Sequence, residues 1–406
     1  MAMALEGVRI FDLTRILSGP FSTQILGDLG ADVIKIEKPG AGDDTRKWGP
    51  PYLADKDGGD TDESAYYLAS NRSKRSVAID IAHPEGQKLA RAMIAKSDVL
   101  FQNFKAGGLK KYGLDFETLH ADFPSLVYCS ISGFGKTGPY SSRAGYDYLA
   151  QGYGGIMSVT GQPDGEPLKV GVGIADIMCG MYATVAILAA LRHRDRTGEG
   201  QEIDLSLLDT QVAWLANEGE NYLISGKVPK RLGNEHPNIV PYKRFDTSDG
   251  EVVLAAGNDG QFRRWCGFAG ADDLLTDERF STNPSRVRNR DALYEKMIPY
   301  FRKKSTSEWV DGLAGLGVPC GPVNDISQVF EDPQIRHREM KIDVPHHRSK
   351  SGTVPLLGNP IKMSATPPVY DKAPPTLGQH TDEILREMLE MDDNELKRLR
   401  EAGIIG

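Results

Sequence analysis

A single carboxylate, Asp176, stands in the glycine-rich and otherwise almost uncharged stretch KVGVGIADIMCGMYA. The run DIMCGMYATVAILAAL that starts at this residue is nearly all apolar and predicts a long helix buried in a core. Asp176 would then lie in the first turn of the helix, where unpaired backbone N–H groups favour negative charge. Two interpretations follow. Asp176 either caps the helix, or it is a nucleophile or base placed beside a glycine-rich loop.

Small and basic residues recur in clusters along the first half of the chain: TRILSGP, EKPGAGDDTRKWGPP, SNRSKRS, NFKAGGLKKYG and GFGKTG. Each cluster lies at or near the end of a stretch that reads as a strand, and open α/β sheets bind ligands at the carboxyl ends of their strands. Glycines interspersed with Lys and Arg suit a long phosphorylated ligand. The alternative is ordinary loop composition with solvated charges.

The elements that must position these clusters alternate between strand and helix. The strand-like stretches are GVRIFDL, DVIKIEK, RSVAIDI, DVLFQNF and SLVYCSIS, and two of the intervening helices are opened by Pro20 and Pro84. The strand QEIDLSL and one helix, LDTQVAWLANEGENYLI, follow the long apolar helix. Such alternation predicts an α/β fold with a Rossmann-like parallel sheet and helices on both faces. We expect this large, ligand-binding domain to span residues 1–225.

The pattern changes in the second half of the chain. The stretch YKRFDTSDGEVVLAAG predicts two strands joined by a Ser-Asp-Gly turn, and several helices follow it. We assign residues 226–332 to a smaller α+β domain. Residues 333–406 contain a strand-rich return, a Pro-rich stretch and a final helix, and we expect them to pack back on the large domain.

Composition excludes several classes of function. A net charge of -8 with scattered basic residues argues against binding to nucleic acid or to an anionic membrane. The four cysteines lie far apart with no CxxC, which predicts neither a zinc site nor disulfides and suits a reducing, cytoplasmic compartment. The stretches SISGFGKTGPY, GVGIAD and VPHH each depart from the phosphate-loop, dinucleotide or metal motif that they approach. We expect no metal and no permanently bound cofactor.

Taken together, these stretches resemble the class III coenzyme A (CoA) transferases, the family of formyl-CoA transferase and carnitine CoA-transferase. The stretches that carry the resemblance cover nearly the whole chain: LEGVRIFDLTRILSGP, LGADVIKIEKPGAGD, NRSKRSVAIDI, NFKAGGLKKYG, SISGFGKTGPY, TGEGQEIDLSLLD, GVPCGPVND and PPTLGQHTDEIL. The resemblance implies that Asp176 is the nucleophile, that 1–225 binds CoA, and that the substrates are an acyl-CoA and a small carboxylate. It also implies an interlocked homodimer.

The resemblance further implies which residues contact CoA: Ile16, Lys38, Lys74, Asn103, Phe104, Gly108 and Lys111. Formyl-CoA transferase has His and Gln where this chain has Arg15 and Leu17, and its four-glycine lid is not matched, so an oxalate acceptor is not favoured. The stretches GAGDDTRKWGPPY, NEHPNIVPYKRF and AAGNDGQF are instead similar to family members that move CoA from succinyl-CoA to glutarate. A dicarboxylate acceptor needs a cationic partner, for which the candidates are Arg15, Arg46 and Arg143.

The same fold also serves α-methylacyl-CoA racemases, which use a histidine as a second acid/base. At the corresponding position, in RAGYDYLAQGYGG, this chain has Tyr146. An ordinary tyrosine, with a pKa near 10, is poorly suited to take a proton at neutral pH. A CoA-transferase is therefore the main prediction. The alternatives are a racemase-like enzyme, a formyl-CoA:oxalate CoA-transferase and a noncatalytic CoA-binding protein.

Overall fold

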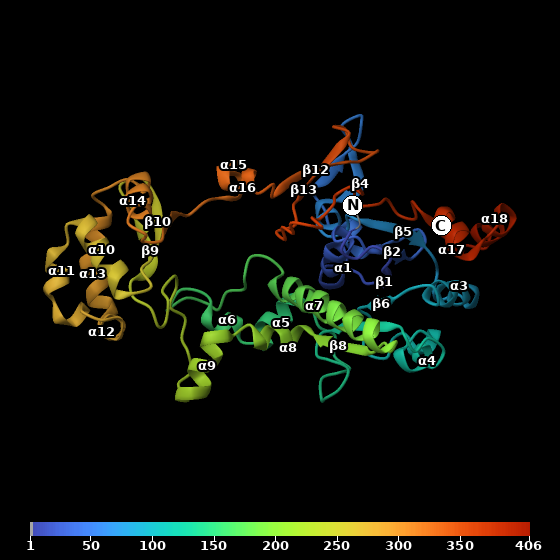
Figure 1. Ribbon diagram of the computed structural model, residues 1–406, viewed down its shortest axis with the longest axis horizontal. Helices are drawn as coiled ribbons and strands as arrows, with labels where there is room; N and C mark the ends of the chain where they lie inside the picture. Colours follow the sequence, from blue (N-terminus) through green and yellow to red (C-terminus); the bar gives the residue numbers. More distant parts are fainter. Residues whose placement is uncertain (1–2) are drawn as a thin grey trace. The chain divides into compact units, whose positions relative to one another are not determined.

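The computed structural model describes residues 3–406, and the chain forms two compact units (Figure 1). Unit 1 comprises the residues up to 156 together with 169–223 and 334–406. Unit 2 comprises residues 157–168 and 224–333. The chain therefore leaves unit 1 and returns to it, and each unit has a hydrophobic core of its own.

Unit 1 is built on a six-stranded sheet in the order β5-β2-β1-β6-β7-β8, with every pair of neighbouring strands parallel. The strands are β1 (Arg9–Leu13), β2 (Asp32–Glu37), β5 (Lys74–Ala78), β6 (Val99–Gln102), β7 (Val127–Ser132) and β8 (Glu202–Ser206). From β1 the chain first adds strands on one side and then, from β6 onward, on the other. Such a reversal opens a crevice at the carboxyl ends of the two central strands, β1 and β6. The predicted parallel α/β sheet is confirmed.

Alternate residues of each strand point to opposite faces of the sheet, and each face has its own core. Ile10 packs with α1 (Ser18–Asp28) and α7 (Ile174–Thr197) on one face. Phe11 packs on the other face with the remaining layer of helices. That layer consists of α3 (Pro84–Ile94), α4 (Phe116–Asp122), α17 (Thr381–Leu389) and α18 (Asp393–Glu401).

Helix α7 has the form that its apolar sequence predicts. Arg194 and Arg196 lie in its last turn, and Gly198 follows in a left-handed conformation with φ of 79°. Among residues 3–406 it is the one helix long and apolar enough to cross a membrane by length and composition. Eight of its residues are buried in unit 1, as in a core helix.

Several smaller elements complete unit 1, and one prediction for this region is wrong. The single helix expected after β8 is two helices, α8 (Leu207–Ala213) and α9 (Ala216–Ser225), because Ala216 adopts a left-handed conformation with φ of 43°. Two hairpins are present, β3 (Tyr52–Ala54) with β4 (Asp60–Ser64) and β12 (Lys341–Pro345) with β13 (Thr353–Leu357). The short helices are η1 (Asp44–Lys47), α2 (Ala65–Leu68), η2 (Lys110–Tyr112), α5 (Asp147–Tyr153) and α16 (Pro333–His337). Helix α6 (Ile156–Val159) begins at the last residue of the first segment of unit 1 and otherwise belongs to unit 2.

Unit 2 contains an antiparallel sheet in the order β11-β10-β9 and a cluster of helices around Trp265 and Trp309. Its strands are β9 (Tyr242–Asp246), β10 (Glu251–Ala255) and β11 (Cys320–Pro322). The helices are α10 (Asp259–Ala269), α11 (Asp272–Thr276), η3 (Glu278–Phe280), α12 (Asn283–Arg288), α13 (Arg290–Phe301), α14 (Thr306–Ala314) and α15 (Ile326–Glu331). Residues 157–168, which the sequence analysis places in the large domain, belong to this unit, where the Gly233 N–H donates to the Gly161 carbonyl.

Candidate active site

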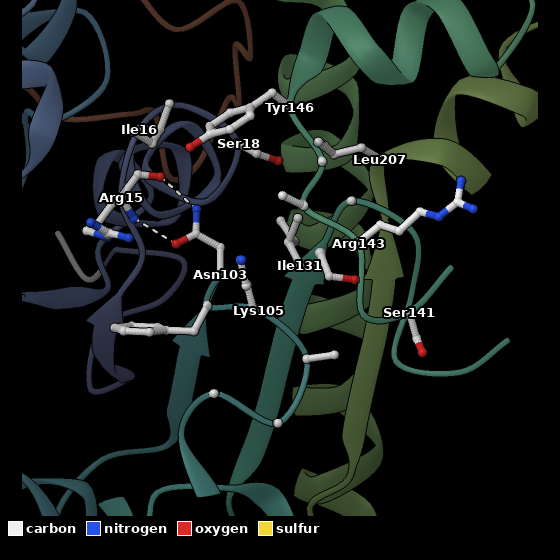
Figure 2. Close-up of a pocket in the computed structure, with 18 of the residues that line it drawn as sticks. Arg15, Ile16, Ser18, Asn103, Lys105, Ile131, Ser141, Arg143, Tyr146 and Leu207 are labelled. Atoms are coloured by element: carbon white, nitrogen blue, oxygen red, sulfur yellow. Dashed lines mark hydrogen bonds between the residues drawn. The ribbon is translucent and has the colours of Figure 1, made fainter. Parts of the chain in front are cut away.

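A cavity of about 600 Å³ opens in unit 1 at the carboxyl ends of β1, β6 and β7 (Figure 2). It lies at the crevice between β1 and β6, where open parallel sheets bind ligands. The loop after β1, the loop after β6 and the loop between β7 and α5 form its walls. Asp176, in the first turn of α7, lines it as well.

The start of α7 is capped by a carboxylate from another helix. The N-cap residue, Gly173, has no side chain to do so. Instead Asp147, the first residue of α5, accepts hydrogen bonds from the N–H groups of Ala175 at 2.8 Å and of Asp176 at 3.3 Å. Its other oxygen accepts a bond from Gln151 Nε2 at 2.7 Å. The interpretation of Asp176 as the cap is therefore wrong, because Asp147 has that role.

The carboxylate of Asp176 is left without a partner. Its side chain is half-buried, and it makes no hydrogen bond or ion pair with any residue in 3–406. Burial, and then the negative charge of Asp147, raise the pKa of Asp176 to about 7. A carboxylate with so few stabilising contacts is a better nucleophile than one held in hydrogen bonds, and a strongly raised pKa in a cavity is typical of a functional group.

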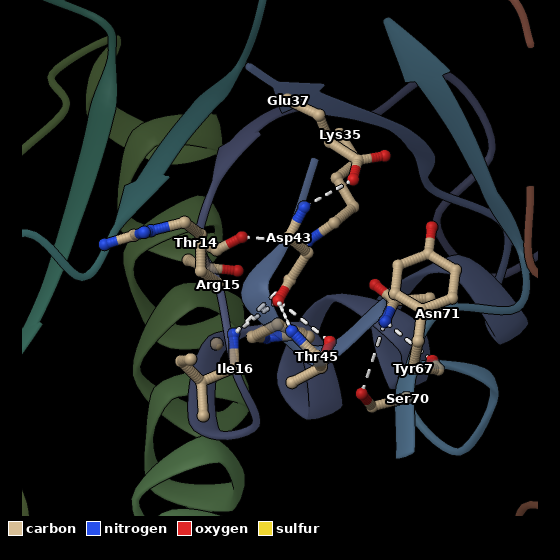
Figure 3. A network of polar contacts seen from close by, with 12 residues as sticks. Thr14, Arg15, Ile16, Lys35, Glu37, Asp43, Thr45, Tyr67, Ser70 and Asn71 are labelled. Carbon is tan, nitrogen blue, oxygen red and sulfur yellow. Dashed lines mark hydrogen bonds and ion pairs between the residues drawn. The ribbon is translucent and has the colours of Figure 1, made fainter. Parts of the chain in front are cut away.

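The loop after β1 is held in place from two sides. The Arg15 N–H donates to Asn103 Oδ1 at 2.9 Å, and Asn103 Nδ2 donates back to the Arg15 carbonyl at 2.7 Å (Figure 2). Ile16 has a φ of 74°, which is unfavourable for a β-branched residue. Its N–H donates to the Asp43 carboxylate at 3.2 Å (Figure 3). These contacts fix the backbone of 15–16 at the wall of the cavity.

Asp43 is itself part of a buried polar network. Lys35 Nζ donates to Asp43 Oδ2 and to the Thr14 carbonyl, each at 2.9 Å, and the Thr45 N–H donates to Asp43 Oδ1 at 3.0 Å (Figure 3). Burial alone would raise the pKa of Asp43, but the charge of Lys35 and the hydrogen bonds from Lys35 and Thr45 lower it to about 2. Asp43 therefore stays ionised and continues to accept the Ile16 N–H.

The structure brings most of the predicted residues together. The predicted residues that line the cavity are Asp176, Ile16, Asn103, Phe104, Gly108, Lys111, Arg15 and Arg143. Lys38 is exposed but does not line it.

Two predicted ligand contacts, Lys74 and Arg46, instead hold the fold. Lys74 is buried, and its Nζ donates to the Pro20 carbonyl and to Asn71 Oδ1, each at 2.9 Å. Arg46 is also buried, and its guanidinium is shared between the carboxylates of Glu37 and Glu63. Neither side chain lines the cavity in this structure.

The two cavity arginines differ in their partners. Arg15 is paired with Asp44 at 2.7 Å. Arg143 lies over the ring of Tyr140, 3.8 Å from its centroid, and donates to the Tyr153 hydroxyl at 3.3 Å. No carboxylate among residues 3–406 pairs with Arg143, so it can bind one from a substrate.

Two features of the site have no signal in the sequence. The capping residue Asp147 follows Tyr146 directly, but no local pattern connects it with a helix that begins at Ile174. Asp43 lies inside the quoted loop EKPGAGDDTRKWGPP, where a buried ion pair with Lys35 has no periodic or motif signal. Both roles depend on contacts between distant segments.

Nearly the whole chain is similar to known CoA-transferases. A family model described as "CoA-transferase family III" matches residues 5–381. The chain belongs to this family. It is 48% identical over 385 residues to the succinate–glutarate CoA-transferase of Agrobacterium fabrum, with 95% of each chain covered. It is 43% identical over 401 residues to the succinyl-CoA:glutarate CoA-transferase of Homo sapiens, covering 99% of this chain and 90% of that one.

The solved structures agree. A CAIB/BAIF family protein from Brucella suis matches with a TM-score of 0.84 and 48% identity over 96% of this chain and all of that one (100%). The resemblance to the class III CoA-transferases is confirmed, and the chain is a transferase of that class.

Proposed function

We propose that this enzyme moves CoA from succinyl-CoA to a short dicarboxylate such as glutarate, with Asp176 as the covalent nucleophile. The observation that supports the proposal is the unpartnered carboxylate of Asp176 in the cavity, which lies where the strand order reverses between β1 and β6. The choice of donor and acceptor rests on the relatives from Agrobacterium fabrum and Homo sapiens, whose names state succinate or succinyl-CoA together with glutarate.

The reaction proceeds by exchange at the Asp176 carboxyl. An Asp176 oxygen attacks the donor thioester carbon, the C–S bond breaks, and the products are an acyl-aspartyl anhydride and CoA thiolate. The thiolate then attacks the aspartyl carbonyl, forms an aspartyl-CoA thioester and releases the donor acid. The acceptor acid runs the two steps in reverse. Holding CoA in the cavity between steps avoids the entropy cost of recapturing it.

The cavity walls supply the contacts for CoA. The residues that we assign to CoA are Ile16, Asn103, Phe104, Gly108 and Lys111, and all of them line the cavity. The Lys111 ammonium is exposed, and a cation of this kind meets the phosphates of CoA. Gly108 has no side chain, so a ligand in the cavity can approach its backbone closely.

For the second carboxylate of the acceptor we favour Arg143 over Arg15. Arg143 has no carboxylate partner among residues 3–406, whereas Arg15 would have to leave Asp44. A guanidinium can hold a carboxylate through two parallel hydrogen bonds. The preference for a dicarboxylate should therefore depend on Arg143.

The test compares glutarate with butyrate, which lacks the second carboxylate, as acceptors from succinyl-CoA. We expect kcat/KM for glutarate to exceed that for butyrate by about tenfold or more, as for a charge-assisted pair. Arg143→Ala should remove most of this preference, and Arg15→Ala is the matched control in the same cavity. Equal kcat/KM values for the two acids in the parent enzyme would refute a dicarboxylate acceptor.

We also propose that the enzyme works as an interlocked homodimer in the cytoplasm. The outer face of α7 carries Tyr182 and Val185, 41% and 61% exposed, beside the buried Ala183 and Thr184. Exposed apolar side chains on a core helix suit a covered interface. All four cysteines are free thiols, which suits a reducing compartment.

A further inference from the structure

Ser18, the first residue of α1, has a buried hydroxyl without a hydrogen-bond partner among residues 3–406. The residue is only 3% exposed, yet it lines the same cavity as Asp176. Figure 2 shows the hydroxyl directed toward Leu207, another residue of the cavity wall. Because a buried hydroxyl without a partner is unfavourable, a partner that enters during the reaction would account for it.

The Cys179 thiol lies close enough to the Ser18 hydroxyl for the hydroxyl to lower the thiol's pKa slightly, but the two groups do not meet the geometry of a hydrogen bond. Burial raises the pKa of Cys179 to about 12, so the sulfur stays protonated and is a weak acceptor. The Ser18 hydroxyl thus remains available to a stronger, anionic acceptor.

Ser18, in α1, packs against the face of α7 that carries Asp176. A Cβ atom added at Gly180 would lie 2.4 Å from the Ser18 carbonyl oxygen, and one added at Gly173 would lie 3.1 Å from Leu17 Cδ2. Residues three and four positions apart share one face of a helix, so Asp176 stands between these two contacts. Leu17 and Ser18 therefore pack against α7 beside Asp176.

The start of α1 also has free backbone donors. Leu17, its N-cap residue, makes no side-chain cap, and no acceptor within residues 3–406 pairs with the N–H groups of Leu17, Ser18 or Gly19. Donors at the start of a helix carry a partial positive charge and favour an anion. The contacts of Arg15 with Asn103 and of Ile16 with Asp43 hold the preceding residues in place.

We propose that Ser18 is a further catalytic residue whose hydroxyl donates a hydrogen bond to the oxyanion formed at the thioester carbonyl. This role rests on the proposed function. When an Asp176 oxygen bonds to the thioester carbon, the π pair of the C=O bond moves onto the carbonyl oxygen. When that bond re-forms, the C–S bond breaks and CoA leaves as a thiolate. Ser18 keeps its proton throughout and stabilises the charge while it resides on oxygen.

The experiment compares Ser18→Ala with the control Ser22→Ala. Ser22 lies one turn further along α1 and is also buried, but its hydroxyl is bonded to Thr184 Oγ1 at 2.9 Å. We expect Ser18→Ala to lower kcat for succinyl-CoA and glutarate by about 10- to 100-fold, with KM for both substrates within about threefold of the parent. Ser22→Ala should keep kcat within about threefold of the parent.

A single-turnover measurement separates this proposal from the proposed function. With succinyl-CoA alone, Ser18→Ala should attach CoA to the Asp176 peptide more slowly than the parent, by the factor seen in kcat. The role of Ser18 would be overturned if kcat of Ser18→Ala lies within twofold of the parent, or if Ser22→Ala loses as much activity as Ser18→Ala. In either case the proposed function would still stand, provided that Asp176→Asn is inactive. Near-parent transfer by Asp176→Asn would overturn both.

Discussion

Two aspartates beside the same cavity show how surroundings decide what a carboxylate does. Asp43 accepts hydrogen bonds from Lys35, Ile16 and Thr45, and its pKa is lowered to about 2 although burial opposes this. The carboxylate of Asp176 accepts no such hydrogen bond from residues 3–406, and burial together with the charge of Asp147 raises its pKa to about 7. The first carboxylate is a permanent structural anion, and the surroundings of the second suit the nucleophilic role that we propose for it.

The raised pKa of Asp176 has a consequence for stability. Its pKa in the folded protein lies above the ordinary value of 3.8, so between about pH 4 and 7 the folded state keeps a proton that the unfolded chain has released. Ionised Asp176 therefore destabilises the folded state, fully so above pH 7. After discounting for its partial exposure, we expect Asp176→Asn to raise the free energy of unfolding at pH 8 by ~1–2 kcal/mol and to change little at pH 4.

Urea unfolding of parent and variant at the two pH values measures this difference. The free energy of unfolding of the variant should exceed that of the parent only at the higher pH. A variant that is less stable than the parent at pH 8 would show that Asp176 makes stabilising contacts in its ionised form.

At the scale of elements, the start of α7 depends on α5. The apolar run after Asp176 predicts α7 because periodicity and composition are local signals. Asp147, which caps α7, lies 29 positions before Asp176 in the sequence, so no local pattern predicts this contact. Arg46 is a similar case, since its partners Glu37 and Glu63 lie on β2 and β4. Contacts between elements thus decide which charged residues are free for a ligand.

Replacing Asp147 should shift the pH dependence of activity. As the proposed nucleophile, Asp176 must be ionised, so we expect kcat/KM to rise with pH through about 7 in the parent, following the raised pKa of Asp176. Burial, which raises this pKa most, is unchanged in Asp147→Asn; the variant keeps an oxygen that can cap α7 but removes the charge that adds to the shift. The midpoint of the pH profile should therefore move to lower pH.

The control is Asp147→Ala, which removes both the charge and the cap. It should show the same acid shift and also a loss of ~1 kcal/mol in the free energy of unfolding. An unchanged midpoint in both variants would mean that Asp147 does not influence the titration of Asp176.

At the scale of the whole molecule, the cavity arises from the order of the strands. Alternation of strand and helix predicts a parallel sheet, but many orders are compatible with it, and the reversal between β1 and β6 appears only in the structure. The same limit applies to residues 157–168. This segment precedes α7 in the chain, yet it hydrogen-bonds with Arg231 and Gly233 in unit 2. Such pairings of distant segments leave no periodic trace in the sequence.

The proposed dimer predicts that the exposed face of α7 is covered by a second copy. Val185→Glu should weaken the dimer because it places a charge on an apolar interface. Lys397→Glu, exposed on α18 on the opposite side of the sheet, is the control and should leave the oligomeric state unchanged. Sedimentation velocity of the full chain measures both, and a monomeric parent would contradict the dimer.

The interlocked form of the dimer has its own test. Chains that pass through one another cannot exchange without substantial unfolding, so differently tagged dimers should stay separate under native conditions. Heterodimers that form rapidly on mixing would leave a dimer in place but exclude interlocking.

The central claim, covalent catalysis by Asp176, is tested most directly by trapping the aspartyl-CoA thioester. The parent enzyme is incubated with succinyl-CoA in the absence of acceptor, denatured, digested and analysed by mass spectrometry. We predict CoA attached to the peptide that contains Asp176, its release by hydroxylamine, and no adduct in Asp176→Asn. The claim would be contradicted by an adduct on another residue, or by an asparagine variant that transfers CoA at near-parent rates.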